Sequence, residues 1–148
     1  GWPYETTLGM ARLVYGGVLA RYPDLKFITH HAGAMVSFMA DRIEGSCDWY
    51  EMALNAKFTK RFPKRPIDYF RLFYNDTAVY GNAPALMCAY SFFGADRLLF
   101  GTDFPYDAEC GDAYTRKTIH AIEAMDVSDS EKEKIFAGNA RRILKIAG

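Results

Sequence analysis

The chain has 148 residues, half of them hydrophobic, and its 18 basic side chains balance its 18 acidic ones. A chain of this length can bury one hydrophobic core, so we expect a single domain over residues 1–148. The balanced charge argues against binding to nucleic acid, and no apolar run reaches the roughly 18 residues of a membrane span. The three cysteines have no paired spacing, which predicts a reducing, cytoplasmic setting rather than a disulfide framework.

The first part of the chain predicts a helix followed by a strand. Apolar residues recur at helical spacing over residues 8–21, with Thr6 or Thr7 as the N-cap, and Pro23 ends this helix. Residues 26–31, Lys-Phe-Ile-Thr-His-His, then form a short apolar strand that ends in two histidines. The short connection is typical of loops in α/β proteins.

The middle of the chain predicts a helix over residues 34–47 and a second strand over residues 70–77, which ends on polar side chains. Between them lies an aromatic and basic segment that starts at Trp49 and reaches Pro66. It could bind an anion or a partner. We favour the alternative, a solvated insertion in which the aliphatic parts of the basic side chains are buried.

A third strand follows a helix over residues 84–93, which has Pro84 in its first turn and ends at Gly94. The strand is the apolar run 98–100, and the sequence Gly-Thr-Asp-Phe-Pro follows it directly. Three strands separated by helices, each ending in polar residues, predict a parallel sheet. Enzymes with such sheets place their chemistry at the carboxyl ends of the strands.

The last part of the chain predicts helices only. Apolar residues at helical spacing indicate a helix over residues 114–125. Ser130 and Glu133 have the spacing of a capping box, which would open a helix that ends at Gly138. Asn139 is then the expected N-cap of the last helix.

The turn after the first strand, with His31 and Gly33, and the Gly-Thr-Asp-Phe-Pro turn of Asp103 resemble a known family. It comprises the amidohydrolase-related metal-dependent barrels, which include aminocarboxymuconate-semialdehyde decarboxylase and the resorcylate decarboxylases. The resemblance covers nearly the whole chain and implies strands six to eight of a TIM-type (β/α)8 barrel. A complete barrel needs about 250 residues, so the expected fold is the C-terminal part of one.

The resemblance implies that Asp103 is a ligand of a catalytic divalent metal, and zinc is the metal we expect. A carboxylate is a suitable donor for such an ion. From the residues alone, an aspartate that caps the following loop is an equally good interpretation. The family's His-x-His pair on the first strand and its histidine on the fifth strand have no counterpart among the three histidines of this chain. We therefore expect weak or absent metal binding by this chain alone.

His31 lines up with a family histidine that lies beside the metal and assists its water, a role that suits an imidazole near neutral pH. We expect His31 to be catalytic and His30 to be structural, because neighbours on a strand point to opposite faces. Arg42 lines up with an arginine that, in the decarboxylases, reaches across a dimer interface to the substrate carboxylate. The alternative is an ordinary arginine on a helix surface.

Two functions remain open. One is a metal-dependent lyase or hydrolase that acts on small carboxylated or cyclic substrates, with this chain as an inactive C-terminal fragment of it. The other is a catalytically incomplete module that assembles with another chain. An open piece of a barrel exposes sheet edges and apolar side chains, so either function predicts a homo-oligomer.

Overall fold

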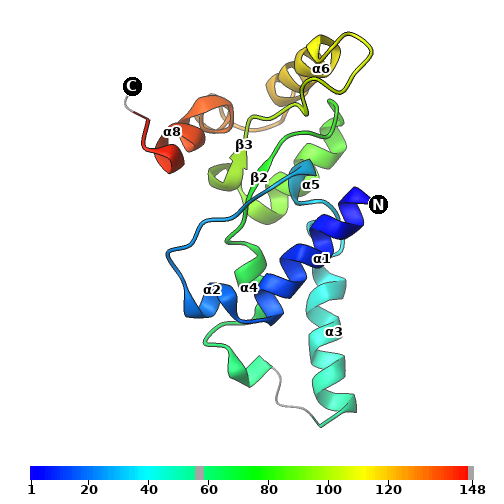
Figure 1. The fold of residues 1–148 in the computed structure, drawn as a ribbon, viewed down its shortest axis with the longest axis vertical. Coiled ribbons are helices and arrows are strands. Elements are labelled where there is room, and N and C mark those ends of the chain that lie inside the picture. Colours follow the sequence, from blue (N-terminus) through cyan, green and yellow to red (C-terminus); the bar gives the residue numbers. More distant parts are fainter. Residues whose placement is uncertain (56–58, 147–148) are drawn as a thin grey trace.

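The computed structural model describes residues 1–55 and 59–146, and its centre is a small parallel sheet (Figure 1). The strands β1 (Ile28–Thr29), β2 (Tyr74–Asp76) and β3 (Leu98–Leu99) lie in the order β1-β2-β3. Ile28 pairs with Tyr74, and Asn75 pairs with Leu98. Because all three strands are parallel, their carboxyl ends meet at one edge of the sheet.

Helices connect the strands and cover the sheet (Figure 1). The α-helices are α1 (Trp2–Tyr15), α2 (Val18–Arg21), α3 (Ala40–Ala53), α4 (Pro66–Phe70), α5 (Ala83–Phe93), α6 (Asp112–Glu123), α7 (Asp129–Glu133) and α8 (Asn139–Leu144). Shorter or irregular helical segments are η1 (His31–Gly33), η2 (Thr59–Arg61), η3 (Ala95–Arg97) and the π-helix η4 (Lys134–Gly138). No helix in the described ranges is long and apolar enough to cross a bilayer.

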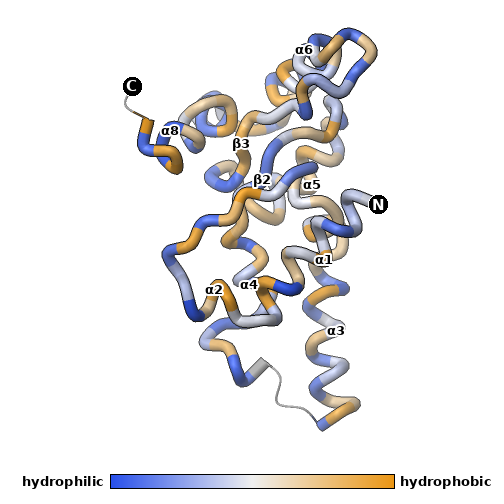
Figure 2. The backbone as a smooth tube through the Cα atoms, in the orientation of Figure 1, coloured by the Kyte–Doolittle hydropathy of each residue, from blue (hydrophilic) through white to orange (hydrophobic). Residues whose placement is uncertain are grey.

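The hydrophobic core lies between the sheet and the helices. The side chains of Phe70, Phe73, Leu86, Leu98 and Ile122 are each at most 1% exposed. Full burial of such a side chain contributes roughly 2 kcal/mol. Figure 2 shows hydrophobic residues at β3 and alternating hydrophobic and hydrophilic residues along α3, as expected for a buried strand and a surface helix.

The two outer strands differ in how their free edges are covered. Beyond β3, the backbone N–H of Phe100 donates to the carbonyl of Ile135 in η4, so this edge has a helical neighbour. The edge of β1 has no paired strand among the described residues, and Ile28 is 54% exposed. The sheet is therefore open on the β1 side.

The first predicted helix is placed too late and runs through a break between two helices. It begins at Trp2 rather than Leu8, and Thr6 does not cap it, because its hydroxyl donates back to the carbonyl of Trp2. The helix stops at Gly16, and α2 follows after Gly17, whose φ of 73° lies in the left-handed region that glycine tolerates.

The second predicted helix and second predicted strand also need correction. α3 begins at Ala40 rather than at residue 34, because the chain is left-handed at residues 31, 32, 33 and 34. It continues to Ala53, so the start of the aromatic and basic segment is helical. Residues 56–58 of that segment lie outside the described residues. Phe70 belongs to α4, and only Tyr74–Asp76 forms a strand.

Two predicted helix caps are wrong. The capping box is formed by Ser128 and Glu131, two residues earlier than the predicted pair. Asn139 is not a cap, because the helical backbone continues through Gly138. Its side chain is 1% exposed and donates to the carbonyls of Ala95 at 2.7 Å and Leu98 at 2.8 Å. Asn139 therefore joins the C-terminal helices to β3.

The predictions for α5, α6 and β3 are confirmed to within two residues. α5 has a proline in its first turn, and Gly94, with φ at 76°, follows its last residue. The side chain of Asn82 accepts the N–H of Ala85 and caps this helix. Strong local signals of this kind need no tertiary contact to be recognised.

Candidate functional site

Three ionisable side chains follow the three strands at the carboxyl edge of the sheet. His31 comes two residues after β1, Asp76 is the last residue of β2, and Asp103 lies four residues after β3. Because β2 is the middle strand, Asp76 lies between the turns that carry the other two residues. The sequence analysis singled out His31 and Asp103 but not Asp76. The sequence signal for Asp76 was similar to that for Asp103, because each carboxylate stands at or just beyond the carboxyl end of a predicted strand.

The turn at His31 departs from strand geometry. The φ angles of residues 31, 32, 33 and 34 are 58°, 54°, 74° and 54°, all in the left-handed region. A Cβ on Gly33 would lie 2.6 Å from the ring of Phe93 and 2.8 Å from Oδ1 of Asn75. The turn therefore packs tightly onto β2 and α5, and glycine is required at its centre.

The two neighbouring histidines do not point to opposite faces, so that prediction is wrong. Their rings are stacked, with centroids 4.6 Å apart and an interplanar angle of 23°. The reason is the left-handed backbone at His31, which ends the alternation of a strand. His30 contacts α1, because its Nδ1 lies 2.8 Å from the hydroxyl oxygen of Thr6.

His31 lines a pocket of about 280 Å³ between its own turn and the start of α5. The lining side chains come from His31, Ala32, Ala34, Ser37, Phe38, Val79, Asn82, Pro84, Ala85 and Cys88. Nδ1 of His31 is buried and has no hydrogen-bond partner among the described residues. A mainly apolar pocket with a few polar groups and one imidazole is suited to a small organic molecule.

Asp103 is half-buried and accepts a hydrogen bond on Oδ2 from the hydroxyl of Tyr80, at 2.7 Å. Tyr80 in turn stacks on Tyr114 of α6, with ring centroids 3.8 Å apart. The hydrogen bond to Asp103 raises the pKa of Tyr80 to about 12. A cis peptide joins Phe104 to Pro105 directly after the acid. Sequence reasoning did not identify Tyr80, which lies in the connection between β2 and α5.

The carboxylate of Asp76 is largely enclosed by backbone. Its Oδ1 accepts the N–H of Ala78 at 2.9 Å and that of Ala32 at 3.4 Å. Burial raises the pKa of Asp76 above its ordinary value, and these N–H groups oppose the shift. A Cβ on Gly101 would lie 2.9 Å from the Asp76 Cβ, so the chain leaving β3 passes close to this acid.

Arg42 does not share the pocket of His31. It is exposed on α3 and lines a separate hollow with Trp49 and Tyr50 of the same helix. A role in substrate binding across an interface stays a prediction.

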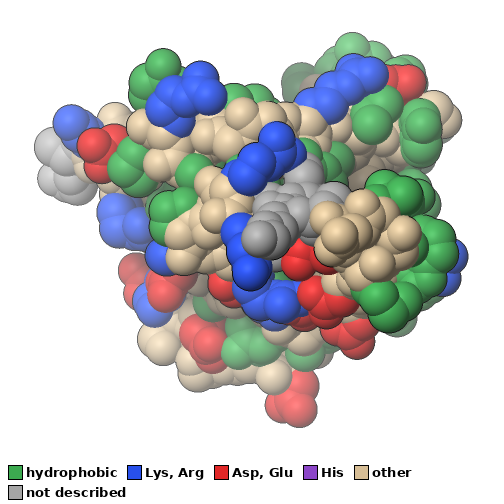
Figure 3. All heavy atoms as spheres, turned by 90° about the horizontal axis from the view of Figure 1, so that it is seen from below, with side chains coloured by type: hydrophobic (Ala, Val, Ile, Leu, Met, Phe, Trp, Pro, Cys, Tyr) green, Lys and Arg blue, Asp and Glu red, His purple; other side chains and the backbone are tan. Residues whose placement is uncertain are grey.

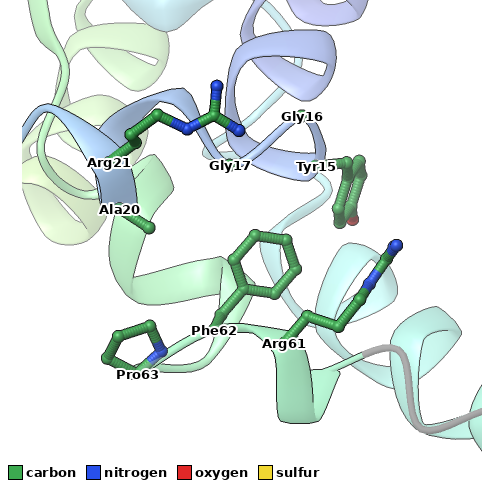
Figure 4. A pocket seen from close by; sticks show the side chains of 8 residues that line it. All are labelled: Tyr15, Gly16, Gly17, Ala20, Arg21, Arg61, Phe62 and Pro63. Carbon is green, nitrogen blue, oxygen red and sulfur yellow. The ribbon is translucent and has the colours of Figure 1, made fainter.

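A second pocket, with basic and aromatic side chains, lies beside α2 and the segment that precedes α4, at the opposite end of the sheet (Figure 4). Its volume is about 410 Å³, and Arg21 and Arg61 lie on either side of Phe62 there. Because α2 precedes β1 and α4 precedes β2, this end carries the amino ends of the strands. Seen from below, Lys and Arg side chains on this face are mixed with Asp and Glu (Figure 3). That mixture favours the interpretation of a solvated surface.

The described residues supply part of a metal site. A carboxylate from Asp103 and an imidazole from His31 are donor types that zinc and manganese accept, and the buried Nδ1 of His31 lacks a partner within the described ranges. No group of three His, Cys, Asp or Glu in residues 1–55 and 59–146 is placed to hold a metal ion. A catalytic zinc site uses three protein ligands, so the donor set of these residues is incomplete.

Comparison with known sequences places this arrangement in context. Residues 1–146 match the family model of the amidohydrolases. The chain is 30% identical over 148 residues to a gamma-resorcylate decarboxylase of Polaromonas sp., which covers 96% of this chain and 41% of that protein. It is 29% identical to the 2-amino-3-carboxymuconate-6-semialdehyde decarboxylase of Dictyostelium discoideum, over 97% of this chain and 38% of that protein. The chain thus spans about two-fifths of the relatives' length.

Solved structures give the same result. A dihydroxybenzoic acid decarboxylase from Polaromonas sp. with bound manganese and the inhibitor 2-nitroresorcinol matches 97% of this chain and 41% of its own, at a TM-score of 0.77 and 29% identity. IDCase from Metarhizium anisopliae in its apo form matches 98% of this chain and 40% of its own, at a TM-score of 0.82 and 30% identity. The predicted partial barrel is confirmed, and the chain belongs to the amidohydrolase family.

Proposed function

We propose that this chain is the C-terminal part of a metal-dependent decarboxylase that removes carbon dioxide from a small hydroxylated aromatic acid. The observation that carries the proposal is the placement of His31 and Asp103 after neighbouring parallel strands, in a chain similar to a gamma-resorcylate decarboxylase. Residues 1–148 then form one partial domain, and the rest of the barrel supplies the missing strands.

The reaction determines what the residues of this chain have to do. The bond between the ring carbon and the carboxylate breaks, carbon dioxide leaves, and the electron pair that remains on the ring carbon takes up a proton. An imidazole can hold that proton near neutral pH, and His31 lines the pocket beside the sheet edge. The apolar lining of the pocket excludes water from the ring, so His31 delivers the proton.

Asp103 and the remaining ligands outside this chain would hold the divalent metal. When bound, the ion polarises an oxygen of the substrate and so stabilises negative charge that develops on it. Manganese is present in more than one solved neighbour, and zinc stays the prediction from the resemblance. One carboxylate oxygen of Asp103 accepts a hydrogen bond from the hydroxyl of Tyr80, which would help to orient this ligand.

Association with a further copy accompanies this function. The open edge of β1 and the exposed aromatic side chains of α3, Trp49 and Tyr50, support contact with other parts of the protein or with another chain. In such an assembly Arg42 of one copy would bind the substrate carboxylate of the other, because arginine binds a carboxylate with two parallel hydrogen bonds.

The decisive experiment restores the rest of the barrel. The coding DNA upstream of Gly1 is sequenced, and the extended protein, if it contains a His-x-His pair, is assayed with 2,6-dihydroxybenzoate and manganese or zinc. We expect carbon dioxide release, and a loss of kcat of at least about 100-fold in His31→Gln, the size of a general acid–base contribution. Asp126→Ala, an exposed acid distant in sequence from these turns, is the control. Full activity in His31→Gln would refute the assignment.

The alternative is a catalytically incomplete module, which the incomplete donor set of the described residues favours for this chain alone. Elemental analysis after dialysis, on the wild type and on Asp103→Ala, tests whether Asp103 holds a metal, and the assay of the extended protein separates the two functions. We expect substoichiometric metal and no activity from the 148-residue chain under either function. One tightly held ion per chain that survives Asp103→Ala would exclude Asp103 as a ligand.

A further inference from the structure

The backbone of the His31 turn needs contacts from neighbouring elements to keep its conformation. Four consecutive residues with φ between 54° and 74° form this turn. Left-handed backbone costs roughly 1–2 kcal/mol per residue that is not glycine, and three of the four are not glycine. A turn of this kind persists only where neighbouring groups stabilise it, and they are found on β2.

Asp76 is the neighbour that reaches the turn. Its Oδ1 accepts the N–H of Ala32, which lies inside the turn, and also the N–H of Ala78 just beyond β2. The N–H of His31 also acts on this carboxylate and lowers its pKa, as does the charge of the His31 ring, although burial has the larger, opposite effect. One carboxylate thus contacts both the backbone of the His31 turn and the backbone that follows β2.

The end of β2, where Asp76 lies, also packs against the chain that leaves β3. A Cβ at Gly101 would come within 2.9 Å of the Asp76 Cβ, and the neighbouring Thr77 hydroxyl donates to the carbonyl of Gly101 at 2.9 Å. The backbone N–H of Gly101 lies 3.1 Å from the same hydroxyl oxygen. Asp76 therefore has little freedom to move, and its position relative to the turn of Asp103 is defined.

Holding a turn with a buried carboxylate costs folding free energy. Burial raises the pKa of Asp76, which means that ionisation at neutral pH costs folding free energy. An asparagine would accept the same N–H groups without that cost. Perturbed acids of this kind are concentrated at functional sites, which gives a reason for a charge here.

We propose that Asp76 is a positioning residue for His31, which holds the left-handed turn through the N–H groups at residues 31 and 32 and so determines where the imidazole lies. The proposal rests on the proposed function for the role of His31. It assigns a task to an acid that the decarboxylation itself does not use. Asp76 acts through His31.

The test uses the 148-residue chain and NMR spectroscopy, so it does not depend on catalysis. Only three histidines are present, and His120, exposed on α6, is an internal reference for the imidazole signals. In Asp76→Ala we expect the amides of Ala32 and Ala78 to exchange with solvent about tenfold faster or more, as for the loss of one buried hydrogen bond. The ring signals of His31 should shift or broaden while those of His120 stay.

Two further variants separate positioning from general stability. Asp76→Asn keeps an acceptor oxygen, so it should restore slow exchange at Ala32 and Ala78, with a urea midpoint at or above that of the wild type. Asp126→Ala, the charge-matched control, should alter none of these signals. Should Asp76→Ala fail to fold, Asp76→Val, which keeps much of the volume and has no hydrogen-bond acceptor, takes its place.

The proposal is overturned if a folded Asp76→Ala or Asp76→Val leaves the Ala32 amide and the His31 ring signals as in the wild type. It is equally overturned if Asp76→Asn behaves like the variants without an acceptor. Failure of the proposed function would give a different experimental result. The extended protein would then lack decarboxylase activity, while the coupling between Asp76 and the His31 turn would persist in these spectra.

Discussion

Tyr80 and Asp103 come from different turns, and the phenolic hydroxyl of Tyr80 donates to Oδ2 of Asp103 at 2.7 Å. The contact links the connection after β2 to the turn after β3. It occupies one oxygen of the acid that the resemblance assigns to a metal. Tyr80 itself is supported by the stacked ring of Tyr114 on α6.

This contact predicts a high pKa for one tyrosine. The hydrogen bond to Asp103 raises the Tyr80 pKa from 10.0 to about 12, so the folded state favours the neutral phenol. Its contribution to stability is complete below pH 10.0 and is lost as the pH rises through about 12. NMR of carbon-labelled tyrosine should detect this titration, and Asp103→Asn should return it toward 10.0. A Tyr80 pKa near 10.0 in the wild type would contradict the contact.

Gly33 is predicted to be irreplaceable. An added Cβ would lie 2.6 Å from the Phe93 ring, at a φ of 74°. Overpacking and left-handed backbone together should make Gly33→Ala cost about 2–4 kcal/mol of unfolding free energy. Gly45→Ala is the matched control, because Gly45 lies inside α3 with nothing within 4 Å of an added Cβ. The control should gain up to about 1 kcal/mol. Equal urea midpoints for the two variants would refute the packing at Gly33.

Asn139 should be important for stability although it lies in a helix. Its amide donates to the carbonyls of Ala95 and Leu98, and the side chain is buried. Asn139→Asp has nearly the same shape but no donor, so it should cost about 2–4 kcal/mol. Asn82→Asp is the control, because aspartate caps a helix as well as asparagine does. If urea denaturation shows a loss below 1 kcal/mol for Asn139→Asp, the carbonyls have found other donors.

The capping box at Ser128 predicts an acid-sensitive helix start. The hydroxyl of Ser128 and, secondly, the hydroxyl of Tyr90 hold the pKa of Glu131 below its ordinary 4.5. Stability from this cap is complete above pH 4.5 and is lost as the pH falls through the lowered pKa. The protection of the Glu131 and Lys132 amides against exchange, relative to the intrinsic rate at each pH, should therefore fall in acid.

Ser128→Ala should cost about 1 kcal/mol at neutral pH, a typical value for a lost N-cap. Ser130→Ala tests the alternative box that the spacing of Ser130 and Glu133 suggests. It should be nearly neutral, because the observed cap uses Ser128. A larger loss in Ser130→Ala than in Ser128→Ala would reverse this assignment.

The sequence by itself determined the fold class, the order of strands and helices, and the family. Apolar runs that end in polar residues predicted the three strands, and the proline and glycine around α5 predicted its limits, because these signals are local. The turn with His31 and the Gly-Thr-Asp-Phe-Pro turn of Asp103 together indicated the barrel family, which the comparisons confirm.

Only the tertiary structure decided how the site is held. Asp76, Tyr80 and Asn139 act on residues 23 to 44 positions away, through contacts that no local pattern encodes. The stacking of His30 on His31 also depends on the left-handed turn at His31. This turn is stabilised by its packing against Phe93 and by the hydrogen bond from the N–H of Ala32 to Asp76. Local propensity disfavours that backbone, and the contacts that outweigh it exist only once the strands are side by side.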